Sequence, residues 1–519
     1  MLNDNIRLAR QNKGLSVEDA AEASGISAEV LTDLENGTIL PTGEQLAALS
    51  FAYGVTADGL CGTSDTKNAG DIEPNYEQIT PWEIWSKTLQ TEYRQSYDEG
   101  RDIESLEPLI TAISKLPATK EKEDMCDILY KMISRLPMRK DYKYSEPNTL
   151  DAIRALRKPY SVKLKARNVP DSMLGGWFGR ICGCLLGKPI EGVRSKELEL
   201  VCSRVGNWPI TRYLDKEDFT DDIINEFRLY IFCNCYSKDQ HFMPADDDTN
   251  YMLTAVRLLR RYGRDFTSGN VAQTWLEVQP KGGYCTAERV AYRNFTDGIF
   301  PPESAEYKNS YREWIGAQIR ADVYGYINPC DPEKAAEMCW RDARIAQVKN
   351  GIYGEMWVGA MLAAAYGTDN IMEIIRTGLA EVPQTSRLYE AVEKICTEYE
   401  AGRSEADTFK DIATRWNEYD QYDWCHTVSN AEIVAACLLY GGGDYGRSIC
   451  LAVSQGFDTD CNGATVGSVL GVLIGYENLP KEWTDRVNDT LRSTLVGPEQ
   501  VSITEMANEC LKYLPKEEN

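Results

Sequence analysis

Two stripes of glycine constrain the fold of this chain more than any other feature of its sequence. Glycine recurs at every fourth position in two runs, 175–187 and 463–475. This spacing places each set on one face of a helix. A glycine inside a helix costs about 1 kcal/mol relative to alanine, so each stripe needs a compensating interaction. The flanking charges argue against a membrane dimer face. We therefore predict two central helices whose backbones approach each other closely.

Helical patterns dominate the rest of the chain from residue 170 onward. No convincing series of alternating strands interrupts them, so the sequence predicts an all-α helical bundle. A chain of 519 residues exceeds one ordinary core, and two or three domains are expected. The apolar periodicity predicts helices at 172–187, 249–262, 332–348, 353–366, 386–400, 430–440, 445–455 and 463–475.

The chain reads as a soluble protein. The first ten residues alternate polar and apolar side chains and have no signal-peptide core. The longest apolar run, at 466–474, is far shorter than the roughly 20 residues that span a bilayer. We expect a cytoplasmic protein with no membrane partner. The 16 cysteines include no CxxC pair, so free buried thiols are expected rather than disulfides or a zinc site.

Histidine is scarce, and this restricts the chemistry. The chain has only His241 and His426. A histidine-rich zinc site is nearly excluded, and a Ser-His-Asp triad is disfavoured. Any catalysis is therefore expected to depend on carboxylates.

Acidic residues adjoin the predicted central helices. Glu191 follows the first glycine stripe, three aspartates at 246–248 open an amphipathic helix, and Asp458 and Asp460 precede the second stripe. Helix capping alone is one explanation for three adjacent aspartates. Carboxylates that converge at packed helix ends, however, repel one another unless cations neutralise them. Oxygen donors without histidine indicate Mg²⁺ or Mn²⁺.

The order of these motifs resembles the ADP-ribosylglycohydrolase family. The glycine-rich run 176–191 is similar to the opening helix of that family. Asp247-Asp248-Thr249 is similar to its first metal motif, and residues 456–460 are similar to its closing motif. The resemblance covers residues 170–519. It implies a hydrolase that removes ADP-ribose from a modified protein or other acceptor by cleaving the glycosidic bond at ribose C1″.

The resemblance also implies site residues and a cofactor. Two Mg²⁺ (or Mn²⁺) ions would orient the ribose hydroxyls and the attacking water. Glu191 and Asp248 are the catalytic candidates, with Glu191 suited to acid/base work. The loop at 282–284 would bring backbone amides to the diphosphate of the substrate. The metal candidates are Asp246, Asp247, Asp248, Asp458, Thr459 and Asp460, and the substrate-binding candidates are Gly282, Gly283 and Tyr284.

Three positions depart from the family pattern and leave alternatives open. Asp246 stands where the family has threonine, Cys461 replaces a second threonine, and Lys188 follows Gly187 where the family pattern has aspartate. The metal preference is therefore open. So are two other functions: hydrolysis of another N- or O-glycoside, and a non-catalytic regulator that responds to ADP-ribose.

Residues 1–62 resemble a Cro/repressor-type helix-turn-helix domain with five short helices. The Gly-Ile-Ser turn at 25–27 and Pro41 fall at the expected places. Residues 14–66 contain nine acidic residues and no Lys or Arg, in a chain of net charge −24. The presumed recognition helix, 27–35, offers Glu29, Thr32 and Asp33. DNA is therefore disfavoured as a partner, although the fold permits it; dimerisation or protein contact is the alternative.

Residues 63–169 are predicted to form a helical connector. Helices are expected at 81–97 and within 105–136. Two similar five-residue sequences start at Ile113 and Ile133. Two copies are too few for a solenoid. If the front of the chain only addresses the hydrolase to a partner, deletion of 1–169 should spare activity on small substrates.

Overall fold

The computed structural model describes residues 2–62, 75–227 and 241–516. The chain divides into two compact units, residues 1–78 and 79–519. Residues 79–169 therefore belong to the same unit as 170–519, and the predicted connector is continuous with the main bundle from Ile79.

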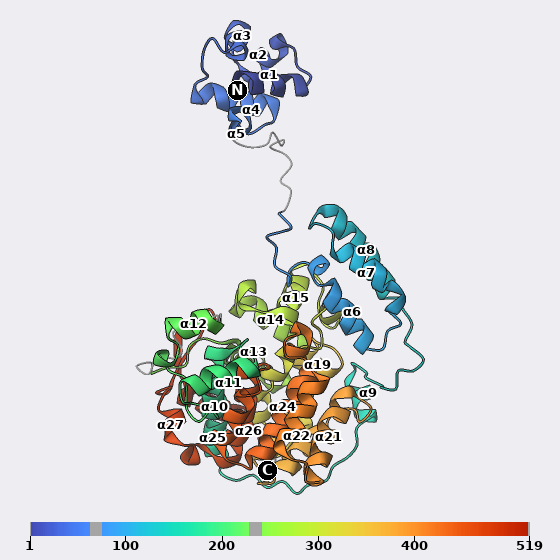
Figure 1. Ribbon diagram of the computed structural model, residues 1–519, viewed down its shortest axis with the longest axis vertical. Coiled ribbons are helices and arrows are strands. Elements are labelled where there is room, and N and C mark those ends of the chain that lie inside the picture. The colour runs from blue at the N-terminus through green and yellow to red at the C-terminus, as the bar shows by residue number, and fades with distance from the viewer. Residues whose placement is uncertain (1, 63–74, 228–240, 517–519) are drawn as a thin grey trace. The chain divides into compact units, whose positions relative to one another are not determined.

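The first unit has the five predicted helices (Figure 1). Ser16 and Thr42 begin two of them with reciprocal capping boxes. Ile6, Leu31 and Leu49 belong to its small core. The helices are α1 (Leu2–Asn12), α2 (Val17–Ser24), α3 (Ala28–Asn36), α4 (Gly43–Tyr53) and α5 (Ala57–Cys61).

The second unit is a helical bundle, which confirms the all-α prediction (Figure 1). Its front helices are α6 (Leu89–Asp98), α7 (Glu107–Ser114), α8 (Lys120–Ile133), α9 (Leu150–Ala155), α10 (Val169–Gly187), α11 (Ser195–Arg204), α12 (Asp221–Phe227), α13 (Asp247–Tyr262), α14 (Ser268–Val278), α15 (Thr286–Thr296), α16 (Glu303–Glu306) and α17 (Asp322–Tyr326). The later helices are α18 (Pro332–Ala343), α19 (Asn350–Ala365), α20 (Ile371–Leu379), α21 (Arg387–Glu400), α22 (Glu405–Arg415), α23 (Gln421–Cys425), α24 (Thr427–Gly441), α25 (Tyr445–Val453), α26 (Thr459–Ile474), α27 (Lys481–Thr484) and α28 (Ile503–Cys510).

The described residues also contain short 3-10 turns and two strands. The strands β1 (Thr490–Arg492) and β2 (Gln500–Ser502) pair antiparallel, with Leu491 opposite Val501. The 3-10 turns are η1 (Trp85–Lys87), η2 (Glu104–Leu106), η3 (Lys188–Ile190), η4 (Lys216–Asp218), η5 (Gly263–Asp265), η6 (Lys281–Gly283), η7 (Ile315–Arg320), η8 (Tyr476–Asn478) and η9 (Leu511–Tyr513). Across the described ranges, no helix is both long and apolar enough to span a bilayer.

The two glycine stripes meet along α10 and α26, the pair of helices with the most extensive contact in the molecule. A methyl group added at Gly179 would overlap the carbonyl oxygen of Gly467, and one at Gly183 would overlap that of Gly463. The relation is reciprocal at Gly467 and Gly463. The stripes therefore allow backbone-to-backbone packing, as the sequence predicts, and this packing brings the acidic ends of the two helices together.

Among the helices predicted from residue 170 onward, two ends lie four or more residues from their predicted positions, and one of them affects the site. Nearer the N-terminus, the helix predicted at 81–97 begins only at Leu89. α26 begins at Thr459 rather than at residue 463, with Asp458 as its N-cap residue. Apolar periodicity alone misses this first turn because its side chains are polar. α18 ends at Ala343, five residues early, since a turn follows.

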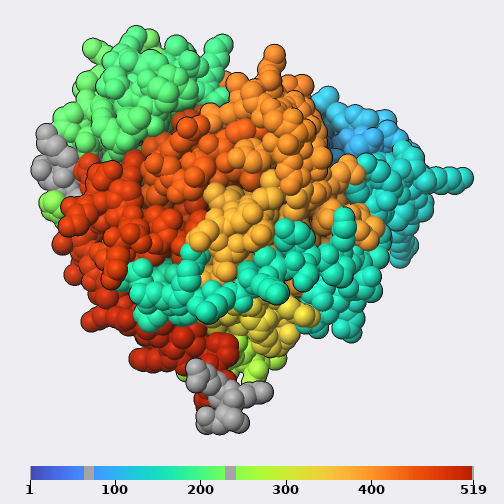
Figure 2. Space-filling view, turned by 90° about the horizontal axis from the view of Figure 1, so that it is seen from below, coloured from blue at the N-terminus to red at the C-terminus, as the bar shows by residue number. Residues whose placement is uncertain are grey.

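Residues 79–169 follow the surface of the main bundle. Helices α6, α7 and α8 share a small core, which includes Leu89, Ile110 and Leu129. The later part is largely extended: Ser145 exchanges hydrogen bonds with Thr385, and Arg167 N donates to the carbonyl of Tyr366. Figure 2 shows this turquoise segment lying across the segments that come later in the chain.

Candidate active site

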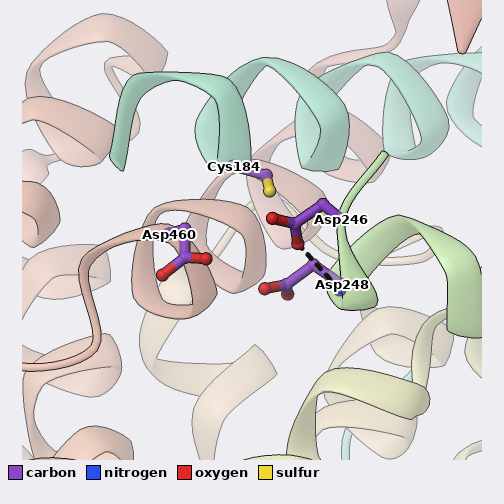
Figure 3. Close-up of side chains that lie close together, drawn as sticks. All are labelled: Cys184, Asp246, Asp248 and Asp460. Atoms are coloured by element: carbon purple, nitrogen blue, oxygen red, sulfur yellow. Dashed lines mark hydrogen bonds between the residues drawn. The ribbon is translucent and has the colours of Figure 1, made fainter. Parts of the chain in front are cut away.

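Three helix ends converge at one place in the second unit. Cys184 comes from the last turn of α10, Asp246 and Asp248 from the start of α13, and Asp460 from the first turn of α26. Their side chains point toward one another (Figure 3). The N-termini of α13 and α26 favour nearby negative charge because of the helix dipole. The contact between the glycine stripes sets the position of Asp460 relative to α10.

Asp246 is fixed by two neighbours. It caps α13 by accepting a hydrogen bond from Asp248 N at 2.9 Å. Its other oxygen lies 2.5 Å from Lys188 Nζ. Burial opposes ionisation of Asp246, but the charge and hydrogen bond of Lys188, together with the hydrogen bond from Asp248 N, lower the pKa of this carboxyl overall. Asp246 is therefore held as a carboxylate.

Asp248 is fully buried beside a buried cation. Arg180 Nη2 lies 2.5 Å from Asp248 Oδ1, and Arg180 Nη1 lies 2.7 Å from Asp322 Oδ2. Arg180 also donates to the carbonyl of Ile319 at 2.7 Å. The second oxygen of Asp248 has no hydrogen-bond partner. A buried carboxylate oxygen without a partner is costly, so this atom fits the role of a ligand to a cation.

The donor atoms form two groups that share Asp460. One group is Cys184, Asp246, Asp248 and Asp460; the other is Asp458, Asp460 and Cys461. In each group the ligand atoms lie within 4.8 Å of one another. Asp460 Oδ1, like the free oxygen of Asp248, has no partner. Two adjacent groups of buried anionic donors fit divalent cations.

The pKa values of these carboxyls show their mutual repulsion. Burial, followed by the charge of Asp246, raises the pKa of Asp247 to about 7 and that of Asp460 to about 6. The charge of Asp460, followed by burial, raises the pKa of Glu191 well above its usual value. Burial and the charge of Asp460 do the same for Asp458. Cations at this position would relieve the repulsion.

A cavity of about 460 Å³ opens above the acidic groups. Its acidic floor includes Glu191, Asp247 and Asp460, whereas Asp248 does not line the cavity. Aromatic residues form part of its walls. The aromatic residues that line it are Trp82, Tyr251, Trp314 and Trp424. An acidic floor under aromatic walls suits a ligand with a polar sugar and a planar group.

Several other predicted site residues lie outside the cavity. Thr459 Oγ1 donates to the carbonyl of Gly187 at 3.0 Å, so this hydroxyl ties α26 to α10. Gly283 lines the cavity, but Gly282 does not. Tyr284 is buried in the core, stacked on Trp275 with ring centroids 4.8 Å apart. Neither Gly282 nor Tyr284 therefore lies in the cavity wall.

Comparison with known proteins identifies the second unit. Residues 165–518 match the family model described as ADP-ribosylglycohydrolase. The chain belongs to the ADP-ribosylglycohydrolase family. It is accordingly a glycosidase of the hydrolase class.

The N-terminal part of this glycohydrolase matches a different protein family. Residues 6–60 match the helix-turn-helix family model. A stretch of 59 residues is 41% identical to an HTH-type transcriptional regulator, DdrOP3, of Deinococcus deserti. That stretch is 11% of this chain and 46% of the relative, so the chain spans about half the length of that relative. The resemblances noted in the sequence are thus confirmed for both parts.

A solved structure described as an ADP-ribosylglycohydrolase-related protein complex is also similar to the glycohydrolase. The match has a TM-score of 0.41 and 14% identity, and it covers 66% of this chain and 98% of the other.

Sequence reasoning missed several residues of the glycohydrolase site. Cys184 looked like part of an apolar helix, although its four-residue offset from Lys188 places the two on one helix face. Arg180 lies within the glycine-rich run 176–191 but has no role in that pattern, and Asp322 lies outside every motif. A charged residue inside a glycine-rich, otherwise apolar helix was the available signal for Arg180, because such a charge is rarely buried without a partner.

Proposed function

We propose that this glycohydrolase removes ADP-ribose from a modified acceptor by metal-dependent cleavage of the glycosidic bond at ribose C1″. The pair of donor groups that share Asp460, at the floor of an aromatic-walled cavity, carries the proposal. Membership of the family supports the substrate class. The net reaction adds water across the bond from C1″ to the acceptor atom and gives free ADP-ribose and the unmodified acceptor.

Glu191 is the residue placed to move a proton in this reaction. It follows η3, at the end of the glycine-rich helix, and lines the cavity beside Asp247 and Asp460. Its carboxyl can give a proton to the departing acceptor atom or take one from the attacking water. The neighbouring carboxylates would stabilise positive charge that develops at C1″. Asp248, which does not reach the cavity, is better suited to hold a cation than to touch substrate.

Two divalent ions fit the donor atoms, with Asp246, Asp247, Asp248, Asp458 and Asp460 as the candidate carboxylate ligands. When bound, such ions polarise oxygen atoms and orient the sugar and the water. Each donor group also contains a thiol, from Cys184 or from Cys461. Sulfur donors favour softer ions than the oxygen-only sets that suit Mg²⁺. We therefore propose Mn²⁺ rather than Mg²⁺ as the preferred ion.

The test is release of free ADP-ribose from ADP-ribosylated arginine and serine substrates with Mn²⁺, with Mg²⁺ and with EDTA. Simple nucleosides serve as a third substrate class. Metal-dependent release of ADP-ribose is the expected result. Asp460→Asn should abolish it and weaken metal binding, while Asp297→Asn, at an exposed loop position, should not. Release from nucleosides alone would identify hydrolysis of another glycoside instead.

For the first unit we propose a protein partner rather than DNA. On α3, Glu29 and Thr32 are exposed and Asp33 is partly exposed, and Arg10 pairs with Glu35 at 2.6 Å. This surface has no cation to neutralise phosphates. The similarity to a transcriptional regulator supports the opposite outcome. A salt-dependent gel-shift assay with the full chain decides between them, since DNA binding at physiological salt would refute the proposal.

A further inference from the structure

One wall of the cavity comes from a segment ahead of the family domain. Trp82 lines the same cavity as Glu191, Asp247 and Asp460. The family match begins only at residue 165. Trp82 is partly exposed, and its ring packs against a cluster that includes Tyr311 and Trp314. This residue is therefore an addition of this chain to the pocket.

The neighbouring glutamate fixes Trp82 in place. Glu83 Oε2 accepts from Lys281 Nζ at 2.8 Å, and Oε1 accepts from Arg289 Nε at 2.9 Å. Burial opposes ionisation of Glu83, but hydrogen bonds from Lys281 and Arg289 lower its pKa overall. The Arg289 guanidinium also lies 5.6 Å from the centre of the Trp82 ring. Glu83 and Arg289 thus hold the indole at the cavity from two directions.

The helix that follows is anchored by buried ion pairs. Arg312 Nη1 lies 2.9 Å from Glu92, and Arg312 Nε lies 2.6 Å from Glu99. Gln95 Nε2 donates to Glu313 Oε2 at 2.6 Å. All these side chains are buried. Removing one partner from such a buried network leaves an uncompensated charge, so α6 is an integral part of the second unit.

Two of the other aromatic residues offer little free ring surface, whereas Trp424 is partly exposed like Trp82 but has a guanidinium closer to its ring. Trp314 is 2% exposed. The Arg194 guanidinium lies 4.4 Å from the ring centre of Trp424. Tyr251 is 6% exposed and packs near Trp275, with 5.8 Å between the ring centroids. Among the described aromatic residues of the cavity, Trp82 is thus well suited to receive a planar ligand.

We propose that Trp82 contacts substrate and stacks on the base of its nucleotide. The inference rests on the proposed function and adds a residue that recognises the base rather than the ribose. An acidic floor suits the sugar end, where cations are held, and an indole suits a planar heterocycle. Deleting residues 1–169 would remove this wall. Because the same segment carries α6, whose buried ion pairs stabilise the second unit, a substitution of Trp82 rather than this deletion isolates the role of the wall.

The test compares two probes on the full chain by titration calorimetry in the presence of Mn²⁺. ADP-ribose carries the base, whereas ribose 5-phosphate lacks it. Trp82→Ala should weaken ADP-ribose binding on the order of 10-fold to 100-fold, the usual loss for a base–aromatic stack. It should leave the Kd of ribose 5-phosphate unchanged. Trp82→Phe keeps an aromatic face and should retain most of the affinity for ADP-ribose.

Phe300→Ala is the matched control, because Phe300 is 48% exposed and does not line the cavity. It should bind both probes as the wild type does. Equal ADP-ribose affinity in Trp82→Ala and wild type would overturn the inference. So would an equal loss for both probes, since Trp82 would then only shape the pocket. If the folded wild type bound ribose 5-phosphate but not ADP-ribose, the proposed substrate class would fail, and the inference would fail with it.

Discussion

The guanidinium of Arg180 lies 2.5 Å from the carboxylate of Asp248, and neither side chain is exposed to solvent. Arg180 comes from the glycine-rich helix α10, and Asp248 from the first turn of α13. The same guanidinium reaches Asp322 at 2.7 Å. One buried cation therefore joins three helices next to the donor group that contains Asp248.

Replacing this cation should destabilise the protein. Arg180→Met leaves Asp248 and Asp322 buried without their partner, and we expect a loss of about 3–5 kcal/mol in the free energy of unfolding. Urea unfolding measures it. Arg180→Met/Asp322→Asn should recover part of the loss. Arg447→Met removes an exposed pair with Glu405 and should cost less than about 1 kcal/mol. Equal losses in the two single variants would contradict the role of Arg180.

The two thiols should set the metal preference. Cys184→Ser or Cys461→Ser replaces sulfur with a harder oxygen, so the ratio of Mn²⁺ to Mg²⁺ affinity should fall, on the order of 10-fold. Competition between the ions, followed by electron paramagnetic resonance of Mn²⁺, measures the ratio. Cys450→Ser, outside both donor groups, is the control. An unchanged ratio in both test variants would show that sulfur does not bind the ion.

The glycine stripes should not tolerate alanine. In Gly179→Ala the new methyl group overlaps the carbonyl oxygen of Gly467, and backbone cannot move aside as a flexible side chain can. We expect a loss of about 1–3 kcal/mol or more, despite the better helix propensity of alanine. Gly282→Ala is the control, because open space surrounds that position. Thermal unfolding that is identical for the two variants would refute close packing of α10 on α26.

Buried His426 should make stability depend on pH. Burial, followed by the charge of Arg387, lowers the pKa of His426 well below its usual value. The ring accepts a hydrogen bond from Val428 N at 3.1 Å and thereby caps α24. Below about pH 6.5 the unfolded state binds a proton that the native state does not. The free energy of unfolding should therefore decrease as the pH is lowered, by up to about 1.4 kcal/mol per pH unit.

Two variants isolate this effect. His426→Gln should unfold with a shallower pH dependence between about pH 6.5 and 5 than the wild type does. His241→Gln, at an exposed position, should keep the wild-type slope. The pH dependence of urea unfolding gives all three slopes. If His426→Gln had the wild-type slope, other groups would be responsible for the acid sensitivity.

Local patterns were sufficient for much of the fold. The apolar residues predicted α13, α19, α21 and α24 to within a few residues. In α21 burial is one-sided and leaves a clear helical period, whereas α19 and α24 are buried on nearly every side and stand out as long apolar runs. The first turn of α26 escaped this method, since Asp458 and Asp460 are polar. These two carboxylates belong to the donor groups rather than to the apolar core.

The sequence by itself determined the helical class of the fold, the close approach of α10 and α26, and the acidic character of the site. Each of these follows from residue type at a regular spacing along one segment. Only the tertiary structure decided which side chains meet. Arg180 and Asp322 are 142 positions apart, Trp82 reaches the cavity from outside the family domain, and Tyr284 points into the core. Such contacts depend on how distant helices pack, and helix periodicity carries no information about the neighbour that a face will find.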